Sequence, residues 1–137
     1  MNYINFIKTN QNYYEDFITR STYHSNAIEG STLSMHETYA LLFNSQHCNI
    51  QNASPREIYE AINHKKILTI LLDKIVDKEL LSHDLLIQIN QIINDNIIYV
   101  GGYRLGPIRI VGFQKKFPYP NELNNDMSKF ILQYNKF

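Results

Sequence analysis

The sequence predicts a mainly α-helical fold with one short β-hairpin. Apolar residues recur at spacings of three and four along most of the chain, and serine–glutamate pairs mark helix starts. Within residues 103–120, which contain glycines and prolines, Ile108-Arg109-Ile110 instead alternate in polarity, a pattern typical of a hairpin or an extended flap. With 137 residues, of which 44% are apolar, we expect one folded domain.

The first predicted helix covers residues 11–28, and Gly30 supplies its stop signal. A second helix is expected to begin at Ser34, because Glu37 three residues later can complete a reciprocal capping box. A polar loop over residues 44–53 follows it.

The clearest helix start in the sequence is Ser54. Pro55 suits the first helical position, and Glu57 supplies the glutamate of a second capping box. Ser82 is expected to cap the next helix. The predicted buried face of that helix consists of Leu85, Leu86, Ile89, Ile92 and Ile93.

Two adjacent glycines, Gly101 and Gly102, are expected to end the helical run before the hairpin. Helical spacing resumes at Leu123, and the apolar face of this last helix continues to Phe137. We therefore expect a truncated chain or half of a larger helical domain; the alternative is a last helix that packs on its own N-terminal neighbours.

Composition excludes several classes of partner. The formal net charge is zero at pH 7, which argues against nucleic acid and anionic membranes, since both attract basic proteins. Cys48 is the single cysteine, and no signal peptide or long apolar run is present, so a cytoplasmic protein is expected. None of the five histidines has metal-binding spacing, and no phosphate-binding glycine loop occurs, so no metal site is expected.

One short stretch stands out chemically, from Ser25 to Gly30. Ser25 and Glu29 are four residues apart and share a face of a helix. Glu29 falls in the last turn, where a carboxylate is unfavourable against the helix dipole. The nearest preceding cation, Arg20, is more than two turns away. Glu29 is therefore expected either to be solvated or to face an arginine from elsewhere.

The run from Ser25 to Leu33, SNAIEGSTL, resembles the inhibitory-helix signature of Fic (Fido) proteins, in the subclass that carries this helix N-terminal to the catalytic core. Further segments resemble that subclass in the right order along nearly the whole chain. They are Ser34-Met35-His36-Glu37, Glu60-Ala61-Ile62-Asn63-His64, Gly102-Tyr103-Arg104, the flap positions Ile108, Ile110 and Gly112, and the prolines Pro118 and Pro120.

The resemblance implies a Fic-like helical domain and an enzyme that transfers AMP from ATP, with Mg²⁺, to a hydroxyl of a target protein. The family's catalytic loop reads His-Pro-Phe-x-x-Asp/Glu-Gly-Asn-Gly-Arg-x-x-Arg, with the histidine as general base and the acidic residue on the metal. No such loop occurs in this sequence. The chain is therefore similar to the N-terminal, regulatory half of a Fic AMP-transferase, and no catalytic residue is assigned to it.

Carried onto this sequence, the family pattern makes Glu29 the inhibitory carboxylate, which pairs with the second arginine of the catalytic loop near the ATP site. Ser25 would support it, and Gly30 completes the signature. The resemblance also implies that Ile110, Val111 and Gly112 lie on a flap that docks an extended segment of the target protein, by strand addition.

The expected organisation is one partial domain over residues 1–137. It comprises an inhibitory-helix region (1–33), a helical core (34–100), the flap hairpin (101–120) and the start of the next helix (121–137). Two alternative hypotheses for the function are a non-catalytic protein-binding module and an antitoxin-like partner that supplies Glu29 in trans. The partners would be a target protein and either a separate catalytic chain or another copy of this one.

Overall fold

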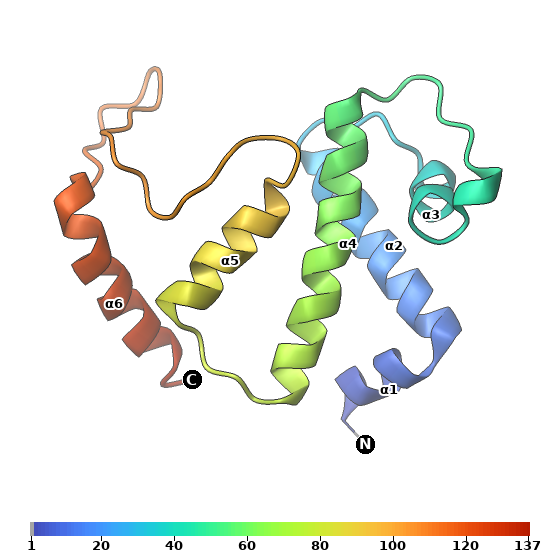
Figure 1. Cartoon of the computed structure of the whole chain (residues 1–137), viewed down its shortest axis with the longest axis horizontal. Coiled ribbons are helices and arrows are strands. Elements are labelled where there is room, and N and C mark those ends of the chain that lie inside the picture. Colours follow the sequence, from blue (N-terminus) through green and yellow to red (C-terminus); the bar gives the residue numbers. More distant parts are fainter. Residues whose placement is uncertain (1) are drawn as a thin grey trace. The chain divides into compact units, whose positions relative to one another are not determined.

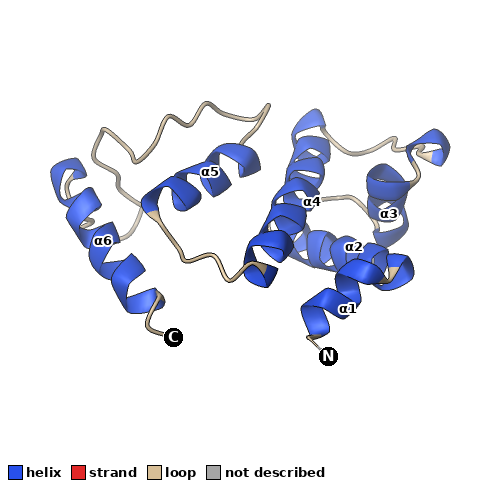
Figure 2. Cartoon of the chain, turned by 60° about the horizontal axis from the view of Figure 1, so that its bottom comes forward, coloured by secondary structure: helices blue, strands red, loops and turns tan. Residues whose placement is uncertain are grey.

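The computed structural model describes residues 2–137, and in this range the chain is mainly helical, as predicted (Figure 1). Its α-helices are α1 (Tyr3–Thr9), α2 (Gln11–Ile28), α3 (Met35–Phe43), α4 (Pro55–Val76), α5 (His83–Ile93) and α6 (Leu123–Tyr134). Two short 3-10 turns are η1 (Ser45–His47) and η2 (Pro120–Glu122). Figure 2 shows helices and loops only.

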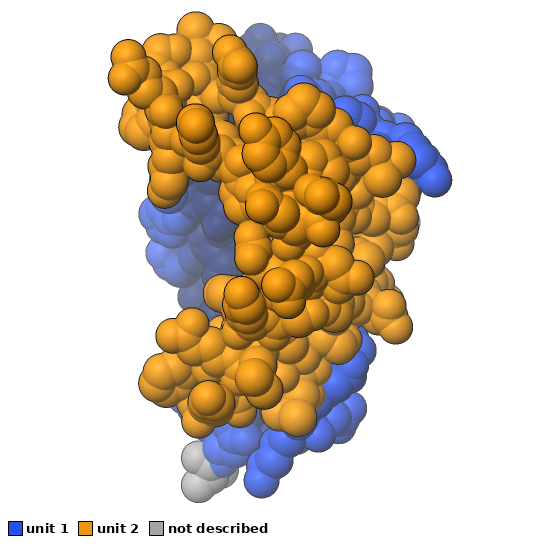
Figure 3. Space-filling model, turned by 90° about the vertical axis from the view of Figure 1, so that its left-hand side faces the viewer, with its two compact units in different colours: residues 1–79, 92–99 blue, residues 80–91, 100–137 orange. Residues whose placement is uncertain are grey.

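The chain divides into two compact units, which Figure 3 distinguishes by colour. Unit 1 comprises the described residues up to Glu79 together with Ile92–Tyr99, and unit 2 comprises Leu80–Gln91 and Val100–Phe137.

In unit 1, helices α2, α3 and α4 pack around one apolar core. The buried side chains of this core are Ile18, Leu33, Leu42, Ala61 and Leu72. Ile18 and Ala61 are wholly buried. Full burial of a side chain such as Ile18 stabilises the fold by about 1.5–3 kcal/mol, so the core fixes how α2 lies against α4.

Both predicted capping boxes are confirmed, at Ser34 with Glu37 and at Ser54 with Glu57. The predicted bounds of α2 are confirmed as well. Helix α1 was not expected from the sequence. It has seven residues, too few for a repeat of three and four to become visible, and its N-cap is Asn2, whose side chain accepts from the backbone N–H of Ile4.

In unit 2, hydrogen bonds rather than a large apolar core connect the elements. The side-chain amide of Asn135, just after α6, both accepts from the Leu81 N–H at 3.0 Å and donates to the Leu81 carbonyl at 2.9 Å. His83 lies at the start of α5. Its Nδ1 is 2.6 Å from the Tyr103 hydroxyl, and its Nε2 is 2.8 Å from the Ser128 hydroxyl. Of the predicted apolar face of α5, Leu85 is the residue that is buried.

The predicted β-hairpin is wrong: no strand forms within the described residues, and 103–119 is an irregular loop. A turn does form, with Gly112 at φ +80° and the Phe113 N–H donating to the Ile110 carbonyl at 3.0 Å. The prolines of this segment donate no backbone hydrogen bond, which weakens any ladder. The guanidinium of Arg104 instead holds the loop, because it donates to the carbonyls of Gly106 and Pro118.

Candidate functional site

A pocket of unit 1 contains two of the residues singled out from the sequence, Glu29 and Gly30. It lies where the end of α2 meets the first turns of α4 and the segment after α5, and its volume is about 510 Å³. The other lining residues are Asn26, Ser31, Arg56, Glu57, Glu60, His64, Ile93, Asn94 and Ile97. We call this the α2–α4 pocket.

The end of α2 is built by a Schellman motif centred on Gly30. The Gly30 N–H donates to the Ala27 carbonyl at 3.0 Å, and the Ser31 N–H donates to the Asn26 carbonyl at 3.0 Å. Gly30 has φ +89°, the left-handed conformation that favours glycine. This motif places Glu29 at the C-cap of α2 with its side chain exposed.

Gly30→Ala is expected to lower the free energy of unfolding by about 1–2 kcal/mol, because a Cβ is unfavourable at this positive φ. No atom lies within 4 Å of the position of that Cβ, so the loss reflects backbone conformation rather than a clash. Urea denaturation would measure the loss. Gly106→Ala is the control, because Gly106 has no positive φ and equally open surroundings; an equal loss there would contradict the left-handed cap.

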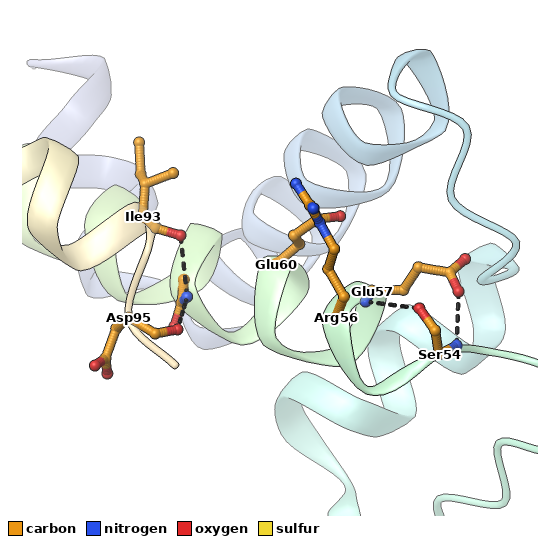
Figure 4. Close-up of polar contacts among 7 residues, drawn as sticks. Ser54, Arg56, Glu57, Glu60, Ile93 and Asp95 are labelled. Atoms are coloured by element: carbon orange, nitrogen blue, oxygen red, sulfur yellow. Dashed lines mark hydrogen bonds and ion pairs between the residues drawn. The ribbon is translucent and has the colours of Figure 1, made fainter. Parts of the chain in front are cut away.

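A single carboxylate, that of Glu57, fastens the loop after α2 to the start of α4. Its Oε1 accepts from the Thr32 N–H at 2.6 Å and from the Thr32 hydroxyl at 2.8 Å. Its Oε2 accepts from the Ser54 N–H at 2.6 Å, which is the capping-box bond visible in Figure 4. Glu57 therefore caps α4 and fixes the position of the SNAIEGSTL segment.

Hydrogen bonds from the backbone of Thr32 and then of Ser54 lower the pKa of Glu57 to about 2. Since this lies below the ordinary value of 4.5, the ionised carboxylate stabilises the fold above about pH 4.5, and its contribution is lost as the pH falls toward 2. The melting temperature of Glu57→Gln should therefore be lower than that of wild type at pH 7, and the gap should narrow between pH 4.5 and 2. Asp126→Asn removes an exposed carboxylate that, among the described residues, interacts only with the N-terminus of α6, so it should leave a much smaller gap; a constant gap for Glu57→Gln would contradict this clamp.

Two further side chains of α4 are already paired within unit 1. Arg56 Nε lies 2.8 Å from Glu60 Oε1, one helical turn away. Both side chains are labelled in Figure 4. His64 Nδ1 lies 2.9 Å from the hydroxyl of Thr22, which is fully buried on α2. Burial lowers the pKa of His64, so the neutral imidazole is favoured.

The remaining wall of the pocket, the segment after α5, is held by Asn63. Its amide nitrogen donates to the carbonyls of Ile93 at 3.0 Å and Asp95 at 2.7 Å (Figure 4). The residue is 1% exposed, so these bonds are shielded from water. Lys66 adds an ion pair with Asp95 at 3.3 Å.

The α2–α4 pocket is acidic, and the carboxylate of Glu29 is the one for which neither an ion pair nor a side-chain hydrogen bond forms among the described residues. Glu57 accepts hydrogen bonds on both oxygens, and Glu60 pairs with Arg56. Among residues 2–137, Glu29 forms no ion pair, and Arg20, the cation on its own helix, pairs with Asp16 instead. Such a site attracts a cation with several donors, such as a guanidinium.

These residues alone do not fit ATP or Mg²⁺. The carboxylates of the pocket would repel phosphates, and in the described part of the chain no group of three or more histidine, cysteine, aspartate or glutamate side chains could hold a metal ion. The residues of the pocket therefore do not form a nucleotide site by themselves.

The structure brings together only part of the predicted site. Glu29 and Gly30 line the pocket, whereas Ser25 is exposed one turn earlier on α2 and does not. Ile110, Val111 and Gly112 lie in unit 2 and are exposed at the turn of the loop. Sequence reasoning missed the contact of Glu57 with Thr32 and that of His64 with Thr22, for which the sequence contains no local signal.

No helix of the described chain is both long and apolar enough for a membrane crossing. Comparison with protein-family models, with curated proteins and with solved structures gave no match for this chain.

Proposed function

We propose that this chain is the regulatory half of a Fic-type protein AMP-transferase, acting in the cytoplasm on a target protein. In this proposal the chain inhibits AMP transfer, and the catalytic loop with its ATP and Mg²⁺ ligands is provided in cis or by a second chain. Glu29 would pair with the second arginine of that loop and so keep the γ-phosphate of ATP from its productive position.

The observation that carries the proposal is that the carboxylate of Glu29 has no ionic partner within residues 2–137. This exposed carboxylate lies at the C-terminus of α2, where the dipole disfavours negative charge, and it has no ion pair within residues 2–137. The neighbouring Glu57 adds negative potential, while Arg56, which also lines the pocket, is already paired with Glu60. An incoming guanidinium would satisfy Glu29 and reduce this accumulated charge.

The positioning of Glu29 supports the same role. The Schellman motif fixes the end of α2, and the Glu57–Thr32 bonds fasten the following loop to α4. The backbone of Glu29 is therefore fixed before pairing, so only its side chain loses conformational freedom when an arginine binds, which favours a specific contact.

The chain is to be mixed with the separately produced catalytic-loop half of a Fic enzyme, and complexes isolated by size-exclusion chromatography. We expect a complex that transfers little labelled AMP from ATP in the presence of Mg²⁺. Replacement of Glu29 should raise the rate of AMP transfer by this complex. Absence of a complex would contradict the proposal, whereas a complex in which Glu29 has no influence would favour the non-catalytic binding module.

The chain alone is expected to transfer no AMP, because its sequence has neither the histidine base nor the phosphate-binding turn of the family loop. Incubation with labelled ATP and Mg²⁺, followed by detection of labelled protein, checks this. Incorporation that is lost on replacing Glu29 or a histidine would show that the chain has a catalytic site of its own.

A further inference from the structure

A second pocket of unit 1 lies between α2 and α3, and none of the described residues lines both it and the α2–α4 pocket. Its volume is about 570 Å³, which suits a small organic ligand. Helix α2 contributes Glu15, Asp16 and Thr19 to its lining, and α3 contributes Met35 and Tyr39, among others. Side chains three or four residues apart share a face of a helix, so each helix turns one face toward the hollow. We call this the α2–α3 pocket.

Thr19 places an unsatisfied hydroxyl beside this pocket. The residue is 5% exposed, and among residues 2–137 its Oγ1 has no hydrogen-bond partner. Buried hydroxyls normally have one: Thr38, which is 1% exposed on α3, donates to the Ser34 carbonyl at 2.8 Å. Thr22 on α2 is paired with His64. Because Thr19 lines the pocket, a ligand bound there can supply the partner that the described residues do not provide.

The carboxylate of Glu15 is hydrogen-bonded but not neutralised. Its Oε1 accepts from the Gln11 amide at 2.7 Å and its Oε2 from the Tyr39 hydroxyl at 3.0 Å, and both donors are neutral. It forms no ion pair within residues 2–137. Its charge acts on Lys65 of α4 through space, but the Lys65 ammonium donates to the Leu42 carbonyl at 2.6 Å. Because each carboxylate oxygen has two acceptor sites, both oxygens of Glu15 can accept another donor.

The lining of the pocket combines net negative charge with apolar surface. Two carboxylates, those of Glu15 and Asp16, stand against one guanidinium, that of Arg20, which pairs with Asp16 at 2.8 Å. Met35 and the ring of Tyr39 add a polarizable thioether and an aromatic face. These groups suit an aliphatic chain that ends in a positive charge, whereas the carboxylates would repel a phosphate or carboxylate ligand.

We infer that the α2–α3 pocket binds a primary alkylammonium group. An ammonium has three donors, and Glu15 and Thr19, one helical turn apart on α2, offer it acceptors on one face. Its alkyl chain would lie against Met35 and Tyr39. A metal ion fits less well, because in the described part of the chain no group of three or more histidine, cysteine, aspartate or glutamate side chains could hold one. The ammonium can belong to a free alkyl diamine or to a lysine side chain of a peptide.

The test is an amide NMR titration of the isotope-labelled full chain with diaminopentane. Saturable shifts are expected for amides of α2 and α3, and pentanediol, which has the same chain length without charge, should cause none. Glu15→Gln keeps the size of the side chain and removes its charge, so the dissociation constant should rise about tenfold or more. The control Asp77→Asn removes an exposed carboxylate of unit 1 that does not line the pocket, and should bind as wild type does.

A second variant, Thr19→Val, removes the hydroxyl and keeps a β-branched side chain of the same shape. The dissociation constant should rise roughly three- to tenfold, as the loss of one hydrogen bond implies. The stability of this variant should not fall, because the hydroxyl it removes has no partner within the described residues. Its urea denaturation curve and its amide spectrum check that it is folded.

The inference is overturned if pentanediol shifts the same amides, or if neither diaminopentane nor N-acetyl-lysine amide causes a saturable shift. It is also overturned if Glu15→Gln or Thr19→Val binds as tightly as Asp77→Asn. Tighter binding of diaminopentane than of the lysine amide would assign the site to a free amine, and the reverse order would assign it to a lysine side chain. Binding is measured without a catalytic half, so its outcome is independent of that for AMP transfer.

Discussion

When the chain is combined with a Fic catalytic half, Glu29→Gly is expected to raise AMP transfer about ten- to a thousandfold. Breaking a largely desolvated ion pair by removing one partner costs about 3–5 kcal/mol, part of which is recovered when the γ-phosphate becomes the counterion of the arginine. Each 1.4 kcal/mol of this difference corresponds to about tenfold in rate. Incorporation of labelled AMP into protein, at saturating ATP, is the measurement.

Three further variants separate the charge of Glu29 from other effects. Glu29→Gln removes the charge and keeps the side-chain shape, so it should release transfer as well. Ile28→Gly introduces a glycine beside it without removing a carboxylate, and Ile28 is 84% exposed, so no release is expected. Ser25→Ala removes one hydrogen-bonding group, worth about 0.5–1.5 kcal/mol, and should release less. If Glu29 is a solvated surface carboxylate, all four variants will behave as wild type.

Asn63→Ala is expected to lower the free energy of unfolding of unit 1 by about 2–4 kcal/mol. The substitution leaves the carbonyls of Ile93 and Asp95, whose hydrogen bonds are part-buried, without their donor. Each such unsatisfied group costs about 1–3 kcal/mol, and the removal of the buried, unpaired Oδ1 of Asn63 offsets part of the sum. Asn63→Asp should be worse, because it replaces the donor with an acceptor that faces two carbonyls. Urea denaturation followed by tyrosine fluorescence reports the change, since the chain has no tryptophan.

Asn12→Ala is the matched control, because Asn12 is exposed on α2, and its substitution should change stability by less than about 0.5 kcal/mol. A loss of similar size in both variants would mean that Asn63 does not hold the segment after α5. Since this segment forms one wall of the α2–α4 pocket, Asn63→Ala should also weaken binding of the catalytic half.

Local signals account for what the sequence predicted correctly. The capping boxes at Ser34 and Ser54 each lie within four residues, and the bounds of α2 follow from its apolar repeat and from Gly30. The hairpin prediction failed because alternation at Ile108 and Ile110 indicates an extended chain without identifying a pairing strand. In the structure, the side chain of Arg104 takes the place of that ladder.

Local sequence patterns do not predict the α2–α4 pocket. Glu57 is recognisable as a capping residue, but its second contact, with Thr32, spans 25 residues along the chain. Asn63 donates to two backbone carbonyls that lie 30 and 32 residues further along the chain. The sequence pattern of side chains does not predict where these carbonyls lie. Glu29 was identified because its unfavourable place at a helix end is visible in the sequence, and the structure adds that no cation in the described part of unit 1 pairs with it.

The central claim, that Glu29 pairs with an arginine of a Fic catalytic loop, is tested most directly by a double-mutant cycle. Titration calorimetry would give the binding free energy between this chain and the catalytic half for wild type, Glu29→Gln, a glutamine replacement of the second loop arginine, and both together. A direct pair predicts a coupling energy of about 1.5 kcal/mol or more. Effects that add to within about 0.5 kcal/mol would contradict the pairing and with it the inhibitory role of Glu29.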